Sequence, residues 1–422
     1  MKKEKILKLS LGIILILAYL VNLSACLIRV GAIDYMEGVS APSVHGKTAD
    51  DSFIYASAAF AGELFKTVYS SDSGKNVLVS PLSVMLALAM AANGAEGDTR
   101  AEMQSVLGDI LTMDELNAYL YSYASNLPRS EKYRVDIANS IWYRDNRSAF
   151  TPSQDFLTVN AGYYGASAYG APFNSSTVRD INNWVNLNTE GMIKKIIDDI
   201  SEDNLMYIIN ALVFEAEWQR IYEKYQVKDG IFTTVSGEEI PVDMMSSSEH
   251  VYVKVNGAHG FAKQYKDSKY SFVTLLPDEG ISIDSFISGL DMRELSDAVR
   301  SKDYRTIVAK MPKFEYSYDV TLNDALAAMG MTAAFDPENA DFSAMGESSL
   351  GNLYIGEVIH KTHISVHEKG TKAGAVTSIG LNGSAAPNEM IYITLDRPFV
   401  YMIVDNQTGL PIFFGCLNRP EK

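Results

Sequence analysis

The feature that most restricts how this chain can fold is a run of small residues near its C-terminus, from Glu368 to Glu389. It lies between an apolar strand that ends near Val366 and a hairpin that starts at Phe399. A loop of this length inside a compact domain is often functional. Its residues alternate as in a strand, and one face carries only small or apolar side chains: Thr371, Ala373, Ala375, Thr377, Ile379 and Leu381. This pattern predicts a loop that can join a sheet with that face buried. The alternative is a solvated linker that is rich in small residues.

The rest of the chain predicts one large α+β domain. Between Asp51 and Pro420 the sequence contains no long run rich in proline, glycine or serine and no internal repeat. Helical and strand patterns follow one another without a regular βαβ order, which indicates α+β rather than a doubly wound sheet. The strand patterns lie at residues 206–214, 251–255, 271–276 and 358–366.

Two local signals in this domain are especially specific. A short strand over residues 76–79 precedes a helix from Leu82 to Ala92, for which Ser80 is the expected N-cap and Pro81 the first-turn residue. Because this helix is apolar nearly all round, we expect it to lie inside the domain. At the other end, residues 399–414 predict a hairpin with a turn over residues 406–409.

Residues 1–26 have the features of an export signal. Basic residues precede an apolar run over residues 11–21, which is too short to span a bilayer comfortably. The run ends in Leu23-Ser24-Ala25-Cys26, which resembles the lipobox of bacterial lipoproteins and predicts lipidation of Cys26. The alternatives are a plain secretory peptide or an uncleaved anchor, and all three place the rest of the chain outside the cytoplasm. Residues 27–50 predict a flexible tether, so the folded domain is expected over residues 51–422.

Cysteine and charge content restrict the partners of this domain. With Cys26 lipidated, Cys416 has no partner for a disulfide, and its place in an apolar run predicts a buried structural thiol. The formal net charge is −16 at pH 7. Such a surface repels phosphate backbones, so no nucleic-acid partner is expected. Membrane contact is expected only through the lipid anchor.

Motifs of catalysis and metal binding are missing from the sequence. It contains no nucleophile elbow, Walker loop, dinucleotide fingerprint or Cys-x-x-Cys pair. Three histidines lie close together, but strand alternation puts His360 on one face and His363 and His367 on the other. They are therefore not expected to converge on one ion. Neither a metal, a cofactor nor an enzymatic activity is predicted.

Short motifs spread over nearly all of residues 51–420 resemble those of the serpin family. They occur in the family's order, which makes coincidence an inadequate explanation. In chain order they are Asn76-Val77-Leu78-Val79-Ser80-Pro81-Leu82-Ser83, Ile208-Ile209-Asn210-Ala211 with Trp218, Leu275-Leu276-Pro277, Met311-Pro312-Lys313-Phe314, Glu368-Lys369-Gly370-Thr371 and Asp396-Arg397-Pro398-Phe399.

The resemblance implies a fold of three β-sheets and about nine helices with an exposed reactive-centre loop, at about residues 368–390. In this family a target protease cleaves the loop and becomes acyl-linked to it. The freed loop then inserts as a strand in the central sheet, carries the protease with it and distorts the protease active site. The alternation over residues 371–381 fits such insertion, because the buried face must carry nothing large or charged.

The resemblance also implies roles for individual residues. Ser80, Ser83, Asn210 and His360 resemble the shutter, whose hydrogen bonds hold the central sheet closed, and Trp218 matches the breach, where the loop enters. The hinge of the loop is implied at Glu368, Lys369, Gly370, Thr371, Lys372, Ala373, Gly374, Ala375 and Val376. Two departures stand out: Lys372 replaces a usual glutamate, and Glu215-Ala216-Glu217 replaces the usual Lys-Gly before the tryptophan.

The family's usual spacing from Glu368 implies a reactive bond at Ser384-Ala385, with a shift within Leu381 to Ala386 left open. Small residues there suit an elastase-like or subtilisin-like protease, whereas Leu381 suits a chymotrypsin-like one. The implied function is suicide inhibition of a serine protease by a secreted, lipid-anchored monomer. The alternatives are a non-inhibitory serpin-fold binding or assembly protein at the cell surface, and a trap for papain-like cysteine proteases.

Overall fold

The structure is a computed structural model that describes residues 31–371 and 390–421, apart from Asp109, Glu131, Lys132, Asn146, Arg147, Glu202 and Asp267. Over these residues it contains nine α-helices and three β-sheets, of eight, nine and two strands. The α+β architecture with three sheets and about nine helices, which the sequence predicted, is confirmed.

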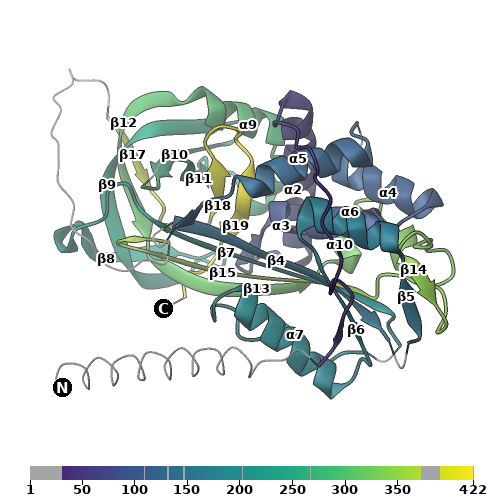
Figure 1. The fold of residues 1–422 in the computed structure, drawn as a ribbon. Helices are drawn as coiled ribbons and strands as arrows, with labels where there is room; N and C mark the ends of the chain where they lie inside the picture. The colour runs from purple at the N-terminus through teal and green to yellow at the C-terminus, as the bar shows by residue number, and fades with distance from the viewer. Residues whose placement is uncertain are drawn as a thin grey trace, which may run out of the picture.

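The eight-stranded sheet, called the central sheet below, runs through the middle of the molecule (Figure 1). Its strand order is β1-β6-β4-β7-β16-β15-β13, with β3 paired to β4. Helix α7 covers one face, and α3 and α5 lie on the other (Figure 1). Such double coverage explains why the middle strand β7 is apolar on both faces. The bounds are β1 Ile33–Asp34, β3 Arg129–Ser130, β4 Tyr133–Arg144, β6 Ser167–Ala171, β7 Met206–Glu217, β13 Phe314–Thr321, β15 Glu357–His367 and β16 Gly370–Thr371.

The nine-stranded sheet packs beside the central sheet and ends in the predicted C-terminal hairpin. Its order is β17-β12-β9-β10-β11-β18-β19-β2, with β8 paired to β9, and a small third sheet joins β5 to β14. The bounds are β2 Val77–Val79, β5 Phe150–Pro152, β8 Val227–Thr233, β9 Glu239–Val255, β10 Ala258–Gln264, β11 Tyr270–Pro277, β12 Asp303–Pro312, β14 Gly346–Ser348, β17 Ile391–Thr394, β18 Phe399–Asp405 and β19 Pro411–Leu417.

Helix α3 is the helix that the Ser80-Pro81 signal predicted. The Ser80 side chain accepts a hydrogen bond from the backbone N–H of Ser83, and every residue of α3 is buried. In the described part of the chain, no helix is both long and apolar enough to cross a membrane. The helices are α2 Asp51–Ser71, α3 Pro81–Ala92, α4 Gly97–Gly108, α5 Met113–Ser125, α6 Gln154–Tyr164, α7 Ser175–Asn188, α8 Ile283–Gly289, α9 Met292–Ser301 and α10 Asn323–Ala328, with short 3₁₀ turns η1 Lys224–Gln226 and η2 Ala333–Phe335.

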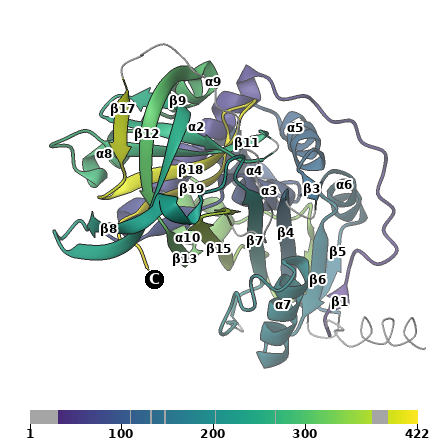
Figure 2. The same cartoon turned by 90° about the vertical axis from the view of Figure 1, so that its left-hand side faces the viewer.

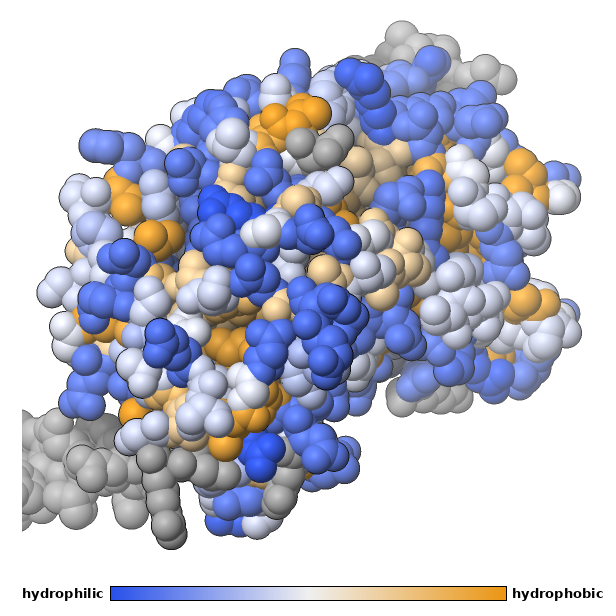
Figure 3. Space-filling view, turned by 90° about the vertical axis from the view of Figure 1, so that its right-hand side faces the viewer, coloured by the Kyte–Doolittle hydropathy of each residue, from blue (hydrophilic) through white to orange (hydrophobic). Residues whose placement is uncertain are grey.

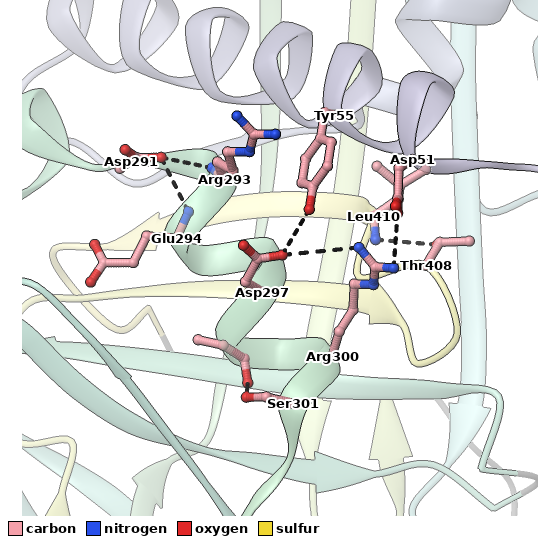
Figure 4. A network of polar contacts seen from close by, with 11 residues as sticks. Asp51, Tyr55, Asp291, Arg293, Glu294, Asp297, Arg300, Ser301, Thr408 and Leu410 are labelled. Atoms are coloured by element: carbon pink, nitrogen blue, oxygen red, sulfur yellow. Dashed lines mark hydrogen bonds and ion pairs between the residues drawn. The ribbon is translucent and has the colours of Figure 1, made fainter.

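Charged side chains join the outer helices α2 and α9 (Figure 4). Arg300 donates to Asp51 over 3.1 Å, and Tyr55 donates to Asp297 over 3.1 Å. The guanidinium of Arg293 lies over the Tyr55 ring, 4.3 Å from its centroid. Because these groups are largely exposed, we expect them to contribute little to the stability of the fold.

The segment before α2 lies against the domain, whereas the sequence predicted a flexible tether there. Strand β1 pairs with β6 at the edge of the central sheet, and the Tyr35 hydroxyl donates to Asp145 over 2.7 Å. Further along, the backbone N–H of Lys47 donates to the Ala118 carbonyl of α5. Figure 2 shows this purple segment running along the outside of the molecule from β1 to α2. The sequence did not predict this strand because β1 has only two residues, which are too few to form a recognisable strand pattern.

Cys416 lies inside β19 with none of its surface exposed. Burial raises the pKa of its thiol well above the ordinary value, so the reactive thiolate is suppressed. We expect the native domain, expressed from residue 27, to show no reaction with a thiol reagent and to react fully in denaturant. Rapid native reaction in a colorimetric thiol assay would contradict this burial.

Candidate functional site

The candidate site lies where β7 and β15 separate at one end of the central sheet. The two strands pair in parallel over Tyr207–Leu212 and Glu357–Thr362. Beyond this paired region β16 lies between them, with Thr371 opposite Ala216 on β7 and Val366 on β15. Gly370 and Thr371 of the predicted hinge therefore already form a short strand inside the sheet.

Gly370 fits this position because it has no side chain. A Cβ atom at residue 370 would lie 2.1 Å from the carbonyl oxygen of Ala216. Any other residue would therefore have to push β16 away from β7. The glycine of the predicted hinge thus permits close pairing between the two strands.

Thr371 reaches a buried aromatic cluster below the hinge. Its side chain is 2% exposed, and its hydroxyl is hydrogen-bonded to the Tyr265 hydroxyl over 2.7 Å. Tyr265 stacks on Trp218 with the ring centroids 4.5 Å apart. Burial raises the pKa of Tyr265, so this hydroxyl stays neutral. The cluster provides a binding pocket for a small polar side chain at residue 371.

Trp218, the predicted breach residue, holds the turn between β15 and β16. Its indole N–H donates to the His367 carbonyl over 2.8 Å, and its backbone N–H donates to the Lys369 carbonyl over 2.9 Å. The backbone N–H of Tyr222 donates to the Glu368 carbonyl over 2.8 Å. Three successive carbonyls before the hinge are therefore held by the segment that follows β7.

The unusual acidic residues before Trp218 have basic partners. Glu217 is nearly buried, and its carboxylate lies 2.9 Å from the ammonium group of Lys266. Glu215 accepts from Arg134 of β4 over 3.0 Å. On the hinge itself, Glu368 forms an ion pair with Lys313. Glu215 and Glu217, which replace the usual Lys-Gly, are thus paired with basic side chains of β4 and of the turn between β10 and β11.

The predicted shutter residues meet at the middle of the β7–β15 pair. Asn210 and His360 are register partners, and the His360 Nδ1 atom is hydrogen-bonded to the Asn210 side-chain oxygen. The backbone N–H of Ser80 donates to the His360 Nε2 atom over 3.0 Å. The Asn210 amide donates to the Ser83 carbonyl over 2.8 Å and also contacts Asn139 of β4. One network therefore joins β4, β7, β15 and the start of α3.

The hydrogen bonds determine the protonation state of His360. Because the Ser80 N–H points at Nε2, this nitrogen must accept, and Nδ1 must carry the proton that binds Asn210. A second proton on Nε2 would face the Ser80 N–H. Burial lowers the pKa of His360 from the ordinary 6.5 to about 3, so the ring is neutral at physiological pH.

The buried His360 predicts an acid-sensitive native state. Its unfolded-state pKa lies near 6.5 and its folded pKa near 3, so its contribution to stability is complete above pH 6.5 and is lost as the pH falls toward 3. Between pH 7.5 and pH 5.5 the free energy of unfolding should fall by about 1 kcal/mol from this residue alone. Urea unfolding at both pH values measures this fall. In the His360→Gln variant, the free energy of unfolding should fall less between these two pH values. A fall equal to that of the parent protein would show that other groups, such as His367, cause the effect.

The other candidate residues divide into three groups. His363 and His367 lie on the face of β15 opposite His360, as predicted, and within the described residues no three histidine, cysteine or acidic side chains gather as metal ligands. Lys372 to Val376 and the reactive bond Ser384-Ala385 lie outside the described residues, as does Cys26. The sequence did not predict that Tyr265 contacts Thr371, that Asn139 contacts Asn210, or that Lys313 pairs with Glu368. These contacts join segments that are distant in sequence, so only the folded structure identifies them.

The sequence matches the family described as serpin (serine protease inhibitor) over residues 55–420. It is 28% identical over 372 residues to an uncharacterized serpin-like protein of Thermococcus kodakarensis, covering 86% of this chain and 84% of that protein. It is 27% identical over 387 residues to the leukocyte elastase inhibitor of Homo sapiens, covering 86% of this chain and 98% of that protein.

The fold is similar to that of the thermophilic serpin tengpin. With tengpin in its native state the TM-score is 0.87 at 47% identity, covering 92% of this chain and 99% of tengpin. With tengpin in its latent state the TM-score is 0.78 at 47% identity, covering 89% of this chain and all of the compared chain (100%). The family match over most of the sequence and the shared fold show that this chain belongs to the serpin family.

Proposed function

We propose that this protein is an exported covalent-trapping inhibitor of serine proteases, with Ser384-Ala385 as its reactive bond. The observation that carries the proposal is the position of β16. Gly370 and Thr371 are paired on both sides, to β7 and to β15, at the end of the sheet where those strands separate. A loop that continued from Thr371 would therefore extend the sheet by lengthening a strand that has already started.

The trapping reaction follows from acyl transfer at this bond. The serine oxygen of the protease attacks the Ser384 carbonyl carbon, the bond to Ala385 breaks, and the serine proton passes through the protease's own base to the new amino group of Ala385. Water would normally hydrolyse the resulting ester. If the cleaved loop inserts before this hydrolysis, the protease active site is distorted. The protease then cannot hydrolyse the ester, and the covalent complex persists.

The shutter network supports the requirement that insertion waits for cleavage. Asn210 and His360 tie β7 to β15 in the middle of the sheet, below the strand that β16 has begun. Both side chains are fully buried. Loop insertion must break this network, and only the favourable pairing of a whole new strand compensates that loss.

The small residues around Ser384 favour an elastase-like or subtilisin-like target. Such proteases accept short side chains at the residue before the cleaved bond, and residues 383–386 are Gly-Ser-Ala-Ala. The similarity to the leukocyte elastase inhibitor points to the same class of target. The lipobox-like sequence ending at Cys26 supports export and attachment to the outer face of a bacterial membrane.

The reactive bond is tested by mixing the domain with pancreatic elastase, subtilisin or chymotrypsin. We expect a denaturant-resistant band for the covalent complex. Its mass should equal that of the protease plus the inhibitor, minus a released C-terminal fragment that starts at Ala385. Gel electrophoresis and mass spectrometry of the fragment measure both results. A fragment that starts at another residue would assign the reactive bond to a different position. In the matched Ser384→Leu variant, the inhibitor should trap chymotrypsin in preference to elastase or subtilisin. Cleavage without a covalent band by all proteases, papain-like enzymes included, would favour the non-inhibitory alternative.

A further inference from the structure

A lysine is buried close to the hinge, although charged side chains usually lie on a protein surface. Figure 3 views the molecule from the side that carries β5, β6 and β14, where hydrophilic side chains predominate and apolar ones form small separate groups. In contrast, the side chain of Lys263 on β10 is only 3% exposed. Its ammonium group lies 2.9 Å from the carboxylate of Glu249 on β9, which is 12% exposed. The hinge contacts described above do not include this buried ion pair.

The ammonium group of Lys263 lies next to both residues that hold the hinge carbonyls. It is 4.3 Å from the centroid of the Tyr222 ring and 5.5 Å from that of the Trp218 ring. A cation within about 6 Å of an aromatic face is attracted to the ring, most strongly where water is excluded. The N–H groups of Tyr222 and Trp218 bind the carbonyls of the three residues before Gly370. We call these two aromatic residues the carbonyl clamp.

A hydrogen-bonded serine connects the ion pair to the clamp a second time. The Ser247 hydroxyl donates to the Glu249 carboxylate over 2.6 Å, and its oxygen lies 3.2 Å from the Tyr222 hydroxyl oxygen. Because the Ser247 proton points at the carboxylate, the Tyr222 hydroxyl donates to Ser247. Burial and the nearby Glu249 raise the pKa of Tyr222 well above its ordinary value, so this proton is retained. Tyr222, Ser247, Glu249 and Lys263 therefore form a closed ring of contacts.

The ion pair is better suited to position the clamp than to stabilise the fold. Moving two charges out of water costs about as much free energy as their attraction returns, so apolar residues of similar volume are often equally stabilising. The ring of contacts has a different effect, because it joins β9 and β10 of the nine-stranded sheet to the segment between β7 and β8. That segment carries Trp218 and Tyr222, and so the second sheet fixes where the clamp lies.

From these contacts we infer that Lys263 and Glu249 are positioning residues that hold the carbonyl clamp in place and thereby fix the register in which loop insertion starts. This inference rests on the proposed trapping function and adds to it two residues outside the hinge and the shutter. While the clamp holds, Thr371 stays opposite Ala216, and a cleaved loop only has to lengthen β16. If the clamp shifts, the loop first has to find this register, and the protease has more time to hydrolyse the ester.

A double variant, Lys263→Met with Glu249→Gln, tests this role. Either substitution alone would leave one buried charge unpaired, which destabilises a protein strongly. In the double variant methionine replaces the aliphatic part of lysine, and glutamine keeps an acceptor for Ser247. Lys254→Met is the matched control, because Lys254 is an exposed lysine on β9. We expect both proteins to keep a urea unfolding midpoint close to that of the parent chain.

Hydrogen exchange of the uncleaved protein measures the clamp without any protease. The backbone N–H groups of Trp218 and Tyr222 donate to the Lys369 and Glu368 carbonyls, so their exchange rates report whether the clamp is closed. In the double variant we expect both groups to exchange at least about tenfold faster, since a desolvated cation–π contact is lost. The paired part of β7 and β15 should keep its parental exchange rates. Mass spectrometry resolves both regions.

The second measurement is the number of inhibitor molecules consumed for each pancreatic elastase molecule inactivated. We expect this number to rise at least about twofold in the double variant and to stay parental in Lys254→Met. Parental exchange at the clamp, or faster exchange there with a parental number, would overturn the inference. A lower unfolding midpoint with faster exchange throughout the sheet would also overturn it, because the pair would then act through stability. Absence of any covalent complex from the parent chain would instead overturn the proposed function, whatever the exchange rates at the clamp.

Discussion

Replacing Thr371 with arginine is expected to convert the inhibitor into a substrate. The Thr371 side chain is 2% exposed and is hydrogen-bonded to Tyr265 in a pocket built from aromatic rings. Burying an arginine there without an anionic partner costs several kcal/mol. If about 3 kcal/mol of this cost enters the barrier for insertion, insertion slows about 100-fold. The protease then hydrolyses the ester before it is trapped.

The measurement is the number of inhibitor molecules consumed for each protease molecule inactivated. We expect this number to rise at least about tenfold in Thr371→Arg, with cleaved inhibitor accumulating on a gel. Thr371→Ser is the matched control, because it keeps the hydroxyl that binds Tyr265. It should trap protease as well as the parent chain does. Stable covalent complexes at the parental yield in Thr371→Arg would refute insertion through this pocket.

Removing the Asn210 side chain is expected to destabilise the native state strongly. Asn210 is fully buried, and alanine there would leave the His360 Nδ1–H group without its acceptor and would remove the hydrogen bond to the Ser83 carbonyl. Unsatisfied buried groups and the new cavity together cost about 2–5 kcal/mol. Because the lost bond to His360 joins β7 to β15, the sheet should also open more readily to an uncleaved loop. We therefore expect Asn210→Ala to lose inhibitory activity on mild heating at least about tenfold faster.

Two measurements check the Asn210 prediction: the midpoint of urea unfolding, and the protease-trapping activity that remains after incubation. Asn139→Ala is the matched control, since Asn139 lies on β4 and contributes only one contact to the Asn210 amide. It should lose less stability and should keep its activity longer. If both variants lose equal stability, the network does not act through the β7–β15 pair.

Much of the fold was predictable because its signals are local. The N-cap Ser80, the first-turn Pro81 and the largely apolar helix that follows lie within a few residues of one another, and α3 forms as expected. The C-terminal hairpin is equally local, with β18 and β19 joined by a short turn. The alternation of His360 and His363 correctly assigned the two faces of β15. In each case the residues that carry the signal also form the contacts.

Features that depend on pairing between distant strands were not predictable in this way. β1 has two residues, and its only indication is its register with β6, more than 130 positions later. The pocket for Thr371 depends on Tyr265 and Trp218, which come from different segments. Whether a small-residue loop begins a strand inside a sheet depends on whether two neighbouring strands separate at the right place. That separation is a property of the whole sheet.

The sequence by itself determined the α+β class, the start and burial of α3, and the small-residue face that a loop needs to enter a sheet. These follow from periodicity, capping and side-chain size, which act over a few residues. Only the tertiary structure decided that Gly370 and Thr371 already lie between β7 and β15, that burial between Ser80 and Asn210 keeps His360 neutral, and that β1 pairs with β6 at the edge of the central sheet. Those facts depend on strand register and on burial, because hydrogen bonds and desolvation act between groups that the chain brings together only when it folds.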